Sequence, residues 1–141
     1  MRETSSAGTT LSLTAIRVTD LRRSAEFYTT GCGFDAEREF STNTFDAAIL
    51  RAGTAGIELI VPRDHAAAPD HGNMFVKLII NTDDVAGLLS RACAHGGTVE
   101  MPATALAEFG GRILGKVRDP DGHLIEVVGL PSRPEQAARD H

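Results

Sequence analysis

Apolar and polar residues alternate along several short runs of this chain, and a period of two predicts β-strands. The first run covers residues 11–18, where Leu13 and Arg17 lie on the same face of the predicted strand. A helix is predicted over residues 21–30, with Asp20 as its N-cap. Three strands are predicted to follow, over residues 36–41, 45–51 and 56–61.

The second half of the chain predicts the same order of elements. A strand over residues 75–82 places Lys77, Ile79 and Asn81 on one face, and a helix over residues 85–94 carries apolar residues at helical spacing. The last predicted elements are a strand over 98–101, a loop over 102–111 and a hairpin that closes near residue 128.

The two halves can be aligned. Residues 84–97 match residues 20–33 at an offset of 64, and residues 125–128 match residues 57–60 at an offset of 68. The repeat predicts an α+β fold made of two βαβββ modules, residues 11–61 and 74–130, within one domain of residues 11–130. We expect the modules to pair into a curved mixed sheet that encloses a pocket, and residues 1–10 and 131–141 to be flexible tails.

Glu126 is a carboxylate in an otherwise apolar strand, and the repeat places Glu58 at the equivalent position of the first module. A carboxylate there costs several kcal/mol unless a charged or hydrogen-bonding group meets it. Two such residues at equivalent places indicate a site. The same sheet faces carry Leu13 in the first module and Lys77 in the second, so we expect these four residues to line the pocket, either within one chain or across a dimer.

Composition narrows the classes of partner. The formal net charge of -5 argues against non-specific binding to nucleic acid. No apolar run is long enough to span a membrane and no signal peptide is recognised, so a cytoplasmic protein is expected. In that compartment Cys32 and Cys93 are expected to be small buried hydrophobes rather than a disulfide. His65 and His71 lie in the linker between the modules, where a solvated loop is favoured over a metal site.

Two stretches resemble a known family. VTDLRRSAEFYTTGCGF (residues 18–34) and RDPDGHLIEVV (residues 118–128) are similar to the vicinal oxygen chelate superfamily, which includes glyoxalase I, extradiol dioxygenases and bleomycin-binding proteins. The resemblance implies paired βαβββ modules. In metal-dependent members it also implies a divalent ion, held by one residue from the first strand and one from the last strand of each module. By this resemblance the four positions in this chain are Leu13, Glu58, Lys77 and Glu126.

The first-strand positions do not suit a metal. Leucine offers no donor atom, and the lysine ammonium has no lone pair and repels a cation. We therefore expect no metal ion and no other cofactor. In the same resemblance His123 belongs to the family signature of the hairpin turn at residues 119–122. We therefore interpret His123 as a structural residue of the turn rather than a catalytic residue.

Three functions remain open. The first is a metal-independent acid/base enzyme, an isomerase, epimerase, cyclase or lyase acting on a carbonyl-containing metabolite. In it Glu126 is the general base, Lys77 its electrostatic partner, and Glu58 orients the substrate. The second is a protein that only sequesters a small-molecule ligand, and the third is a metal-dependent glyoxalase-like lyase.

The candidate substrate-binding residues come from the predicted pocket faces and from a glycine-containing loop. Phe109 and Arg112 flank two glycines and are candidates for a lid, and Arg17 is a candidate either for binding an anionic group or for a surface salt bridge. The full candidate set is Leu13, Arg17, Ile79, Asn81, Phe109 and Arg112. A homodimer is expected, because each open sheet leaves apolar edges that a second copy of the chain can cover.

Overall fold

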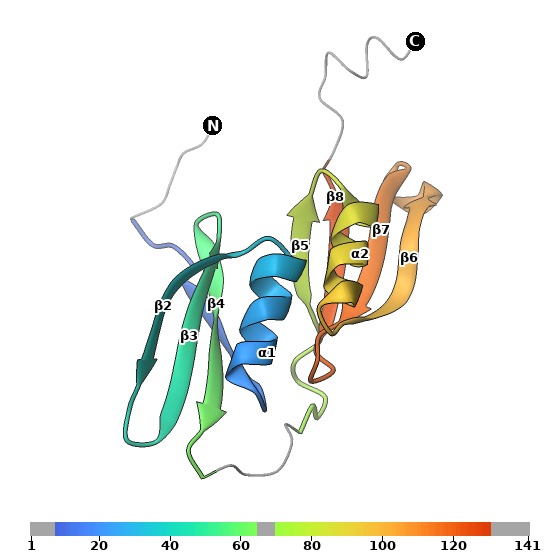
Figure 1. The fold of residues 1–141 in the computed structure, drawn as a ribbon. Helices are drawn as coiled ribbons and strands as arrows, with labels where there is room; N and C mark the ends of the chain where they lie inside the picture. The colour runs from blue at the N-terminus through green and yellow to red at the C-terminus, as the bar shows by residue number, and fades with distance from the viewer. Residues whose placement is uncertain (1–7, 65–69, 131–141) are drawn as a thin grey trace.

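A computed structural model describes residues 8–64 and 70–130 of the chain, which fold into two βαβββ modules (Figure 1). The first module contains β1 (Leu13–Arg17), α1 (Leu21–Glu26), the π-helical η1 (Phe27–Gly31), β2 (Asp35–Ser41), β3 (Phe45–Ala52) and β4 (Ala55–Pro62). The second contains β5 (Leu78–Thr82), α2 (Val85–Ala94), β6 (Thr98–Leu106), the short 3-10 helix η2 (Ala107–Phe109), β7 (Arg112–Arg118) and β8 (Leu124–Gly129).

Both sheets have the same topology. The strand orders are β1-β4-β3-β2 and β5-β8-β7-β6, with the first and last strands of each module parallel and the other neighbours antiparallel. This pairing sets Ala15 beside Glu58 in one sheet and Ile79 beside Glu126 in the other. The α+β class, the duplicated modules and the equivalence of the two glutamates are thus confirmed.

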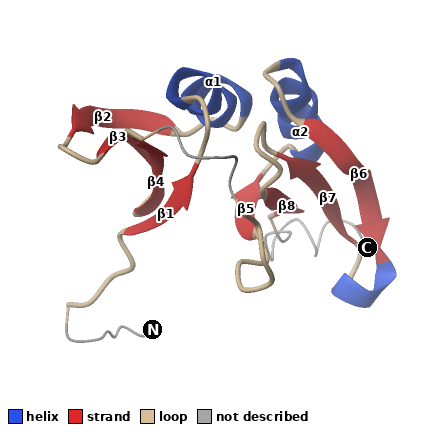
Figure 2. Cartoon of the chain, turned by 90° about the horizontal axis from the view of Figure 1, so that it is seen from below, coloured by secondary structure: helices blue, strands red, loops and turns tan. Residues whose placement is uncertain are grey.

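The two modules pack against each other through their helical segments, and each keeps its own four-stranded sheet. Figure 2 shows α1 and α2 side by side, with one sheet on either side of them. In this layer η1 packs on α2, where a Cβ at Gly31 would lie 3.2 Å from the Cα of Ala92. One buried core therefore takes residues from both modules, among them Phe27, Leu50 and Leu88. The face of each sheet that is turned away from its helix, here called the open face, points outward.

The main differences from the predicted elements concern two strand boundaries and the type of one helix. The strand expected from residue 75 begins at Leu78, and before it the Phe75 ring packs against His123 at 5.8 Å between centroids. The strand expected to end at residue 101 continues to Leu106, since β6 is an edge strand, where Pro102 removes no interior ladder bond. The first helix changes to π-type at Phe27, whose carbonyl accepts from the Cys32 N–H five residues on.

Burial follows the predicted helix and strand faces. Five apolar residues on these faces are buried, and Leu78 packs partly against them; the five are Ile16, Leu88, Leu89, Ile125 and Val127. Both cysteines are free, but only Cys32 is buried, so the prediction was wrong for the exposed Cys93. Residues 1–7, 131–141 and the linker around His65 lie outside the described ranges. No helix within those ranges is long and apolar enough to cross a membrane.

Candidate functional site

An ion pair between Lys77 and Glu126 lies on the open face of the second module. Lys77 Nζ is 2.6 Å from Glu126 Oε1, and the side chains are 32% and 13% exposed. Glu126 points to this face because its neighbours in β8, Ile125 and Val127, are fully buried in the core on the other side of the sheet. The contact predicted from the shared face of Lys77 and Glu126 is therefore confirmed.

A second lysine, Lys116, belongs to the same face and was not among the predicted site residues. It lies in β7 directly opposite Glu126 and is half-buried. Side chains opposite each other in an antiparallel pair have Cβ atoms about 4.5–5.5 Å apart. The sequence signal for Lys116 was its place next to the core residue Val117 in the first strand of the hairpin, because neighbouring residues of a strand point to opposite faces.

Glu58 occupies the equivalent place on the open face of the first module. It lies in β4 between the buried residues Ile57 and Leu59, with Ala15 and Ile49 as its cross-strand neighbours. Within residues 8–64 and 70–130 its carboxylate forms no hydrogen bond or ion pair. Figure 2 shows the two sheets on either side of the helices; Glu58 belongs to the first sheet, whereas the Lys77–Glu126 pair lies at the second. The expectation that all four residues line one pocket, within one chain or across a dimer, stays a prediction.

The donor set does not fit the divalent metal site implied by the family resemblance. Leu13 brings no donor, and the Lys77 ammonium is already bound to one of the two carboxylates. In the described part of the chain no group of three or more His, Cys, Asp or Glu side chains is placed to hold an ion.

The predicted substrate-binding residues are dispersed. Lys77, Ile79 and Asn81 line a groove of about 670 Å³ between β5 and the first module, and Ile79 is 61% exposed. Other lining residues are Thr14, Phe34, Ile57, Leu78 and Ile80. The groove is mainly apolar and adjoins Lys77 without containing either glutamate.

The remaining candidates lie away from this groove. Leu13 is half-buried at the start of β1, and Arg17 is exposed at its end. Phe109 is exposed in η2, and the Arg112 Nε donates to the Gly129 carbonyl at 3.0 Å, which fastens β7 to β8. Arg112 therefore has a structural partner, and a role for Phe109 as a lid remains a prediction.

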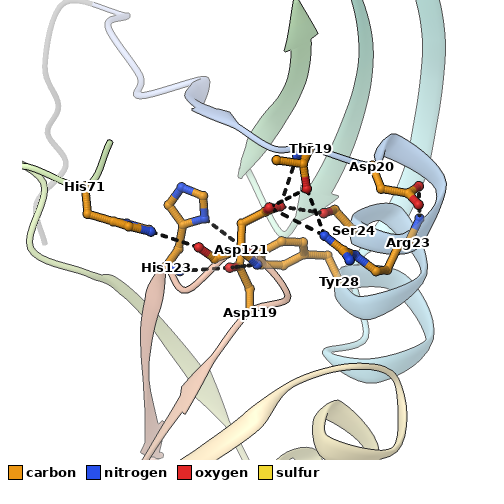
Figure 3. Close-up of polar contacts among 9 residues, drawn as sticks. All are labelled: Thr19, Asp20, Arg23, Ser24, Tyr28, His71, Asp119, Asp121 and His123. Atoms are coloured by element: carbon orange, nitrogen blue, oxygen red, sulfur yellow. Dashed lines mark hydrogen bonds and ion pairs between the residues drawn. The ribbon is translucent and has the colours of Figure 1, made fainter. Parts of the chain in front are cut away.

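A buried network surrounds Asp119 at the turn between β7 and β8 (Figure 3). Tyr28 Oη donates to Asp119 Oδ2 at 2.7 Å, and His123 Nδ1 donates to the same oxygen at 2.9 Å. Asp119 Oδ1 accepts from the backbone N–H groups of Asp121 and His123. Burial alone would raise the pKa of Asp119, but the hydrogen bonds from His123 and Tyr28 hold it below its ordinary value. His123 is thus part of the turn, as predicted.

The same turn joins the two modules. Asp121 accepts hydrogen bonds from the Thr19 hydroxyl at 2.6 Å and from Ser24 at 3.4 Å, and it pairs with Arg23 at 3.5 Å (Figure 3). The ring of His71, expected to be solvated, shares a hydrogen bond of 2.8 Å with the Asp121 carbonyl. The RDPDGH motif therefore connects the hairpin of the second module to the first helix. Both of its carboxylates already have hydrogen-bond partners within the fold.

Comparison with known proteins places these features in a family. The chain is 30% identical over 124 residues to a lactoylglutathione lyase of Arabidopsis thaliana, covering 84% of this chain and 44% of the relative, so it spans less than half of that protein. It is 29% identical over 120 residues to a lactoylglutathione lyase of Salmonella typhimurium, covering 82% of this chain and 88% of the relative.

The fold comparison agrees. Glyoxalase I from Zea mays superposes with a TM-score of 0.76 at 24% identity, over 88% of this chain and 46% of the maize chain. The sequence profile of the Glyoxalase/Bleomycin resistance protein/Dioxygenase superfamily matches residues 10–127, which cover both modules. The chain therefore belongs to the Glyoxalase/Bleomycin resistance protein/Dioxygenase superfamily.

Proposed function

We propose that this chain is a lyase- or isomerase-type enzyme that transfers a proton on a carbonyl-containing metabolite without a bound metal. The observation that carries the proposal is the Lys77–Glu126 pair, which sets a carboxylate and an ammonium 2.6 Å apart on a partly buried face. The relatives named as lyases favour a lyase over the sequestering alternative. They equally favour the metal-dependent lyase, but the donor set at Leu13 and Lys77 counts against that reading.

In the proposed reaction the Lys77 ammonium leaves Glu126 and binds the carbonyl oxygen of the substrate. The freed carboxylate then removes a proton from the carbon next to the carbonyl, and Lys77 stabilises the enolate oxygen. Return of the proton to the same or a neighbouring carbon completes an isomerisation, while departure of a group from the enolate gives a lyase. Each step needs the two side chains to separate, which a pair with 32% exposure on the lysine side permits.

We also propose that the functional unit is a homodimer in which Glu58 reaches the substrate from the second copy. The support is geometric, since the two open faces of one chain are turned away from each other on either side of the helices. In addition, β1 and β5 are edge strands within the described part of the chain. A second copy turned to place its first module over the second module of the other copy would close two equivalent sites.

The chemical step is tested with Glu126→Gln. We expect kcat to fall by roughly 10²–10⁴-fold while substrate binding survives, and solvent deuterium to enter the product of the unmodified chain but not that of the variant. Glu100→Gln is the matched control, because Glu100 is an exposed glutamate paired with Arg118 in the same module. Unchanged turnover in Glu126→Gln would refute the role of this residue. A ligand recovered unchanged after long incubation would favour sequestration, and activity removed together with stoichiometric metal by a chelator would favour the metal-dependent lyase.

The dimeric site is tested by mixing two inactive variants. Glu58→Gln and Glu126→Gln chains, unfolded together and refolded, should form heterodimers in which one site has both glutamates intact, giving about one quarter of the unmodified activity. Sites contained in one chain would give no recovery. A monomer by light scattering at micromolar concentration would also contradict the dimer.

A further inference from the structure

Lysine is rare in this chain and is found in one place. Of the 14 Lys and Arg residues, two are lysines and all others are arginines. Both lysines, Lys77 and Lys116, lie beside Glu126 on the open face of the second module. Two arginines of β7, Arg112 and Arg118, alternate with Lys116 on the same face, but each has a partner, the Gly129 carbonyl and Glu100 respectively.

The strand order brings the two lysines to Glu126 from opposite sides. β8 lies between β5 and β7, so Lys77 approaches from the strand on one side and Lys116 from the strand on the other. Only Lys77 is within ion-pair distance of the carboxylate. In the described ranges Lys116 has no hydrogen-bond or ion-pair partner, although it is half-buried.

The charge at this point is therefore unbalanced. One carboxylate faces two ammonium groups, which leaves a local excess of one positive charge in a chain whose formal net charge is -5. Several arginines are paired instead, for example Arg51 with Glu37 and Arg118 with Glu100. A half-buried cation without a partner costs free energy that a bound anion would recover.

The residue type also matters. An arginine at either position would offer a planar fork that pairs with Glu126 through two hydrogen bonds and holds the carboxylate in place. A lysine ammonium is a compact charge on a flexible stem, so it can move from the carboxylate to a ligand. The buried Leu114 lies on the same face as Lys116, and such apolar surroundings strengthen an ion pair formed there.

We infer that Lys116 binds a carboxylate group of the substrate while Lys77 meets its carbonyl oxygen, so that the substrate is a small oxo acid. The carbonyl half of this assignment rests on the proposed function, whereas the anion site at Lys116 depends only on the arrangement of the two lysines. Carboxylate and carbonyl oxygens of a 2-oxo acid are adjacent, which suits two ammonium groups that flank one glutamate.

The lysine content makes a direct measurement possible. Reductive methylation with ¹³C-formaldehyde labels the two lysines and the amino terminus, and the variants Lys77→Arg and Lys116→Arg assign the two lysine signals by their loss. Pyruvate and hydroxyacetone serve as matched probes, because they share a methyl ketone and differ in the carboxylate. We expect pyruvate to shift the Lys116 signal in NMR spectra and hydroxyacetone to leave it in place.

Binding without turnover separates this inference from the proposed function. Calorimetry should show that Lys116→Met weakens pyruvate binding about tenfold or more, as expected for loss of a charge-assisted contact, and leaves hydroxyacetone unaffected. Glu126→Gln should keep pyruvate binding even though it abolishes proton transfer. Equal binding of both probes, an unmoved Lys116 signal or an unweakened Lys116→Met variant would overturn the inference. A pyruvate site that persists in a chain without proton-transfer activity would overturn the proposed function alone.

Discussion

Removal of the Tyr28 hydroxyl is expected to destabilise the junction between the modules. In Tyr28→Phe the ring remains, and with it the edge-to-face contact with Phe27 at 4.8 Å and the contact with Phe34 at 5.7 Å. What is lost is the buried hydrogen bond of 2.7 Å from the hydroxyl to Asp119. The substitution therefore isolates one polar contact between the first helix and the closing hairpin.

The magnitude follows from the charge of the acceptor. Asp119 is ionised at neutral pH because its pKa is held below the ordinary value, and a hydrogen bond to a charged group contributes about 1.5–3 kcal/mol. The carboxylate keeps its bonds from His123 and from two backbone N–H groups, so it is not left bare. We expect the free energy of unfolding to fall by about 1.5–3 kcal/mol.

The assay is urea unfolding followed by far-ultraviolet circular dichroism, since the chain has no tryptophan. With a urea dependence of about 1–3 kcal/mol per molar, the midpoint should fall by about 1 M. Ser41→Ala is the matched control, because its hydroxyl also donates to a carboxylate, Asp46, at 2.7 Å, but on the exposed surface. The control should lose less than about 0.5 kcal/mol. A Tyr28→Phe variant as stable as Ser41→Ala would refute the reasoning.

Two further predictions concern stability. Leu89→Ala should lower the free energy of unfolding by about 2–5 kcal/mol, because Leu89 is 4% exposed in the helix layer; a loss under about 0.5 kcal/mol by the same assay would show that this helix face is not packed. Stability should also fall at both ends of the pH range. Because the pKa of Asp119 is lowered in the folded state, its ionised carboxylate stabilises the fold at pH values above 3.8, the ordinary pKa of the group. This contribution disappears as pH falls through the folded pKa. Burial raises the pKa of Cys32 from 9.0 to about 12, so its contribution is complete below pH 9 and disappears as pH rises toward 12. Cys32→Ala should flatten the decline that begins at pH 9, as measured by urea midpoints, and an unchanged slope would contradict this assignment.

The sequence by itself determined the modules and the faces of their strands. Periodicity and the internal repeat are local signals, and they placed Glu58 and Glu126 at equivalent positions and Lys77 on the face of Glu126. These predictions succeeded because alternation along a strand sets the direction of each side chain wherever the strand lies. The rule also sets the face of Lys116, but its position opposite Glu126 depends on the register between β7 and β8, which alternation along one strand does not fix.

Only the tertiary structure decided how the modules sit together. The helical segments present apolar surface both to their own sheet and to each other, and Gly31 allows η1 to approach α2 closely. Burying that second surface places the helices between the two sheets (Figure 2), and Glu58 and Glu126 of one chain belong to different sheets. The turn of Asp119 and Asp121 secures the arrangement through partners about 90–100 residues away in the sequence. Such contacts depend on which surfaces remain uncovered once each module has formed, and a periodic pattern within one module carries no information about them.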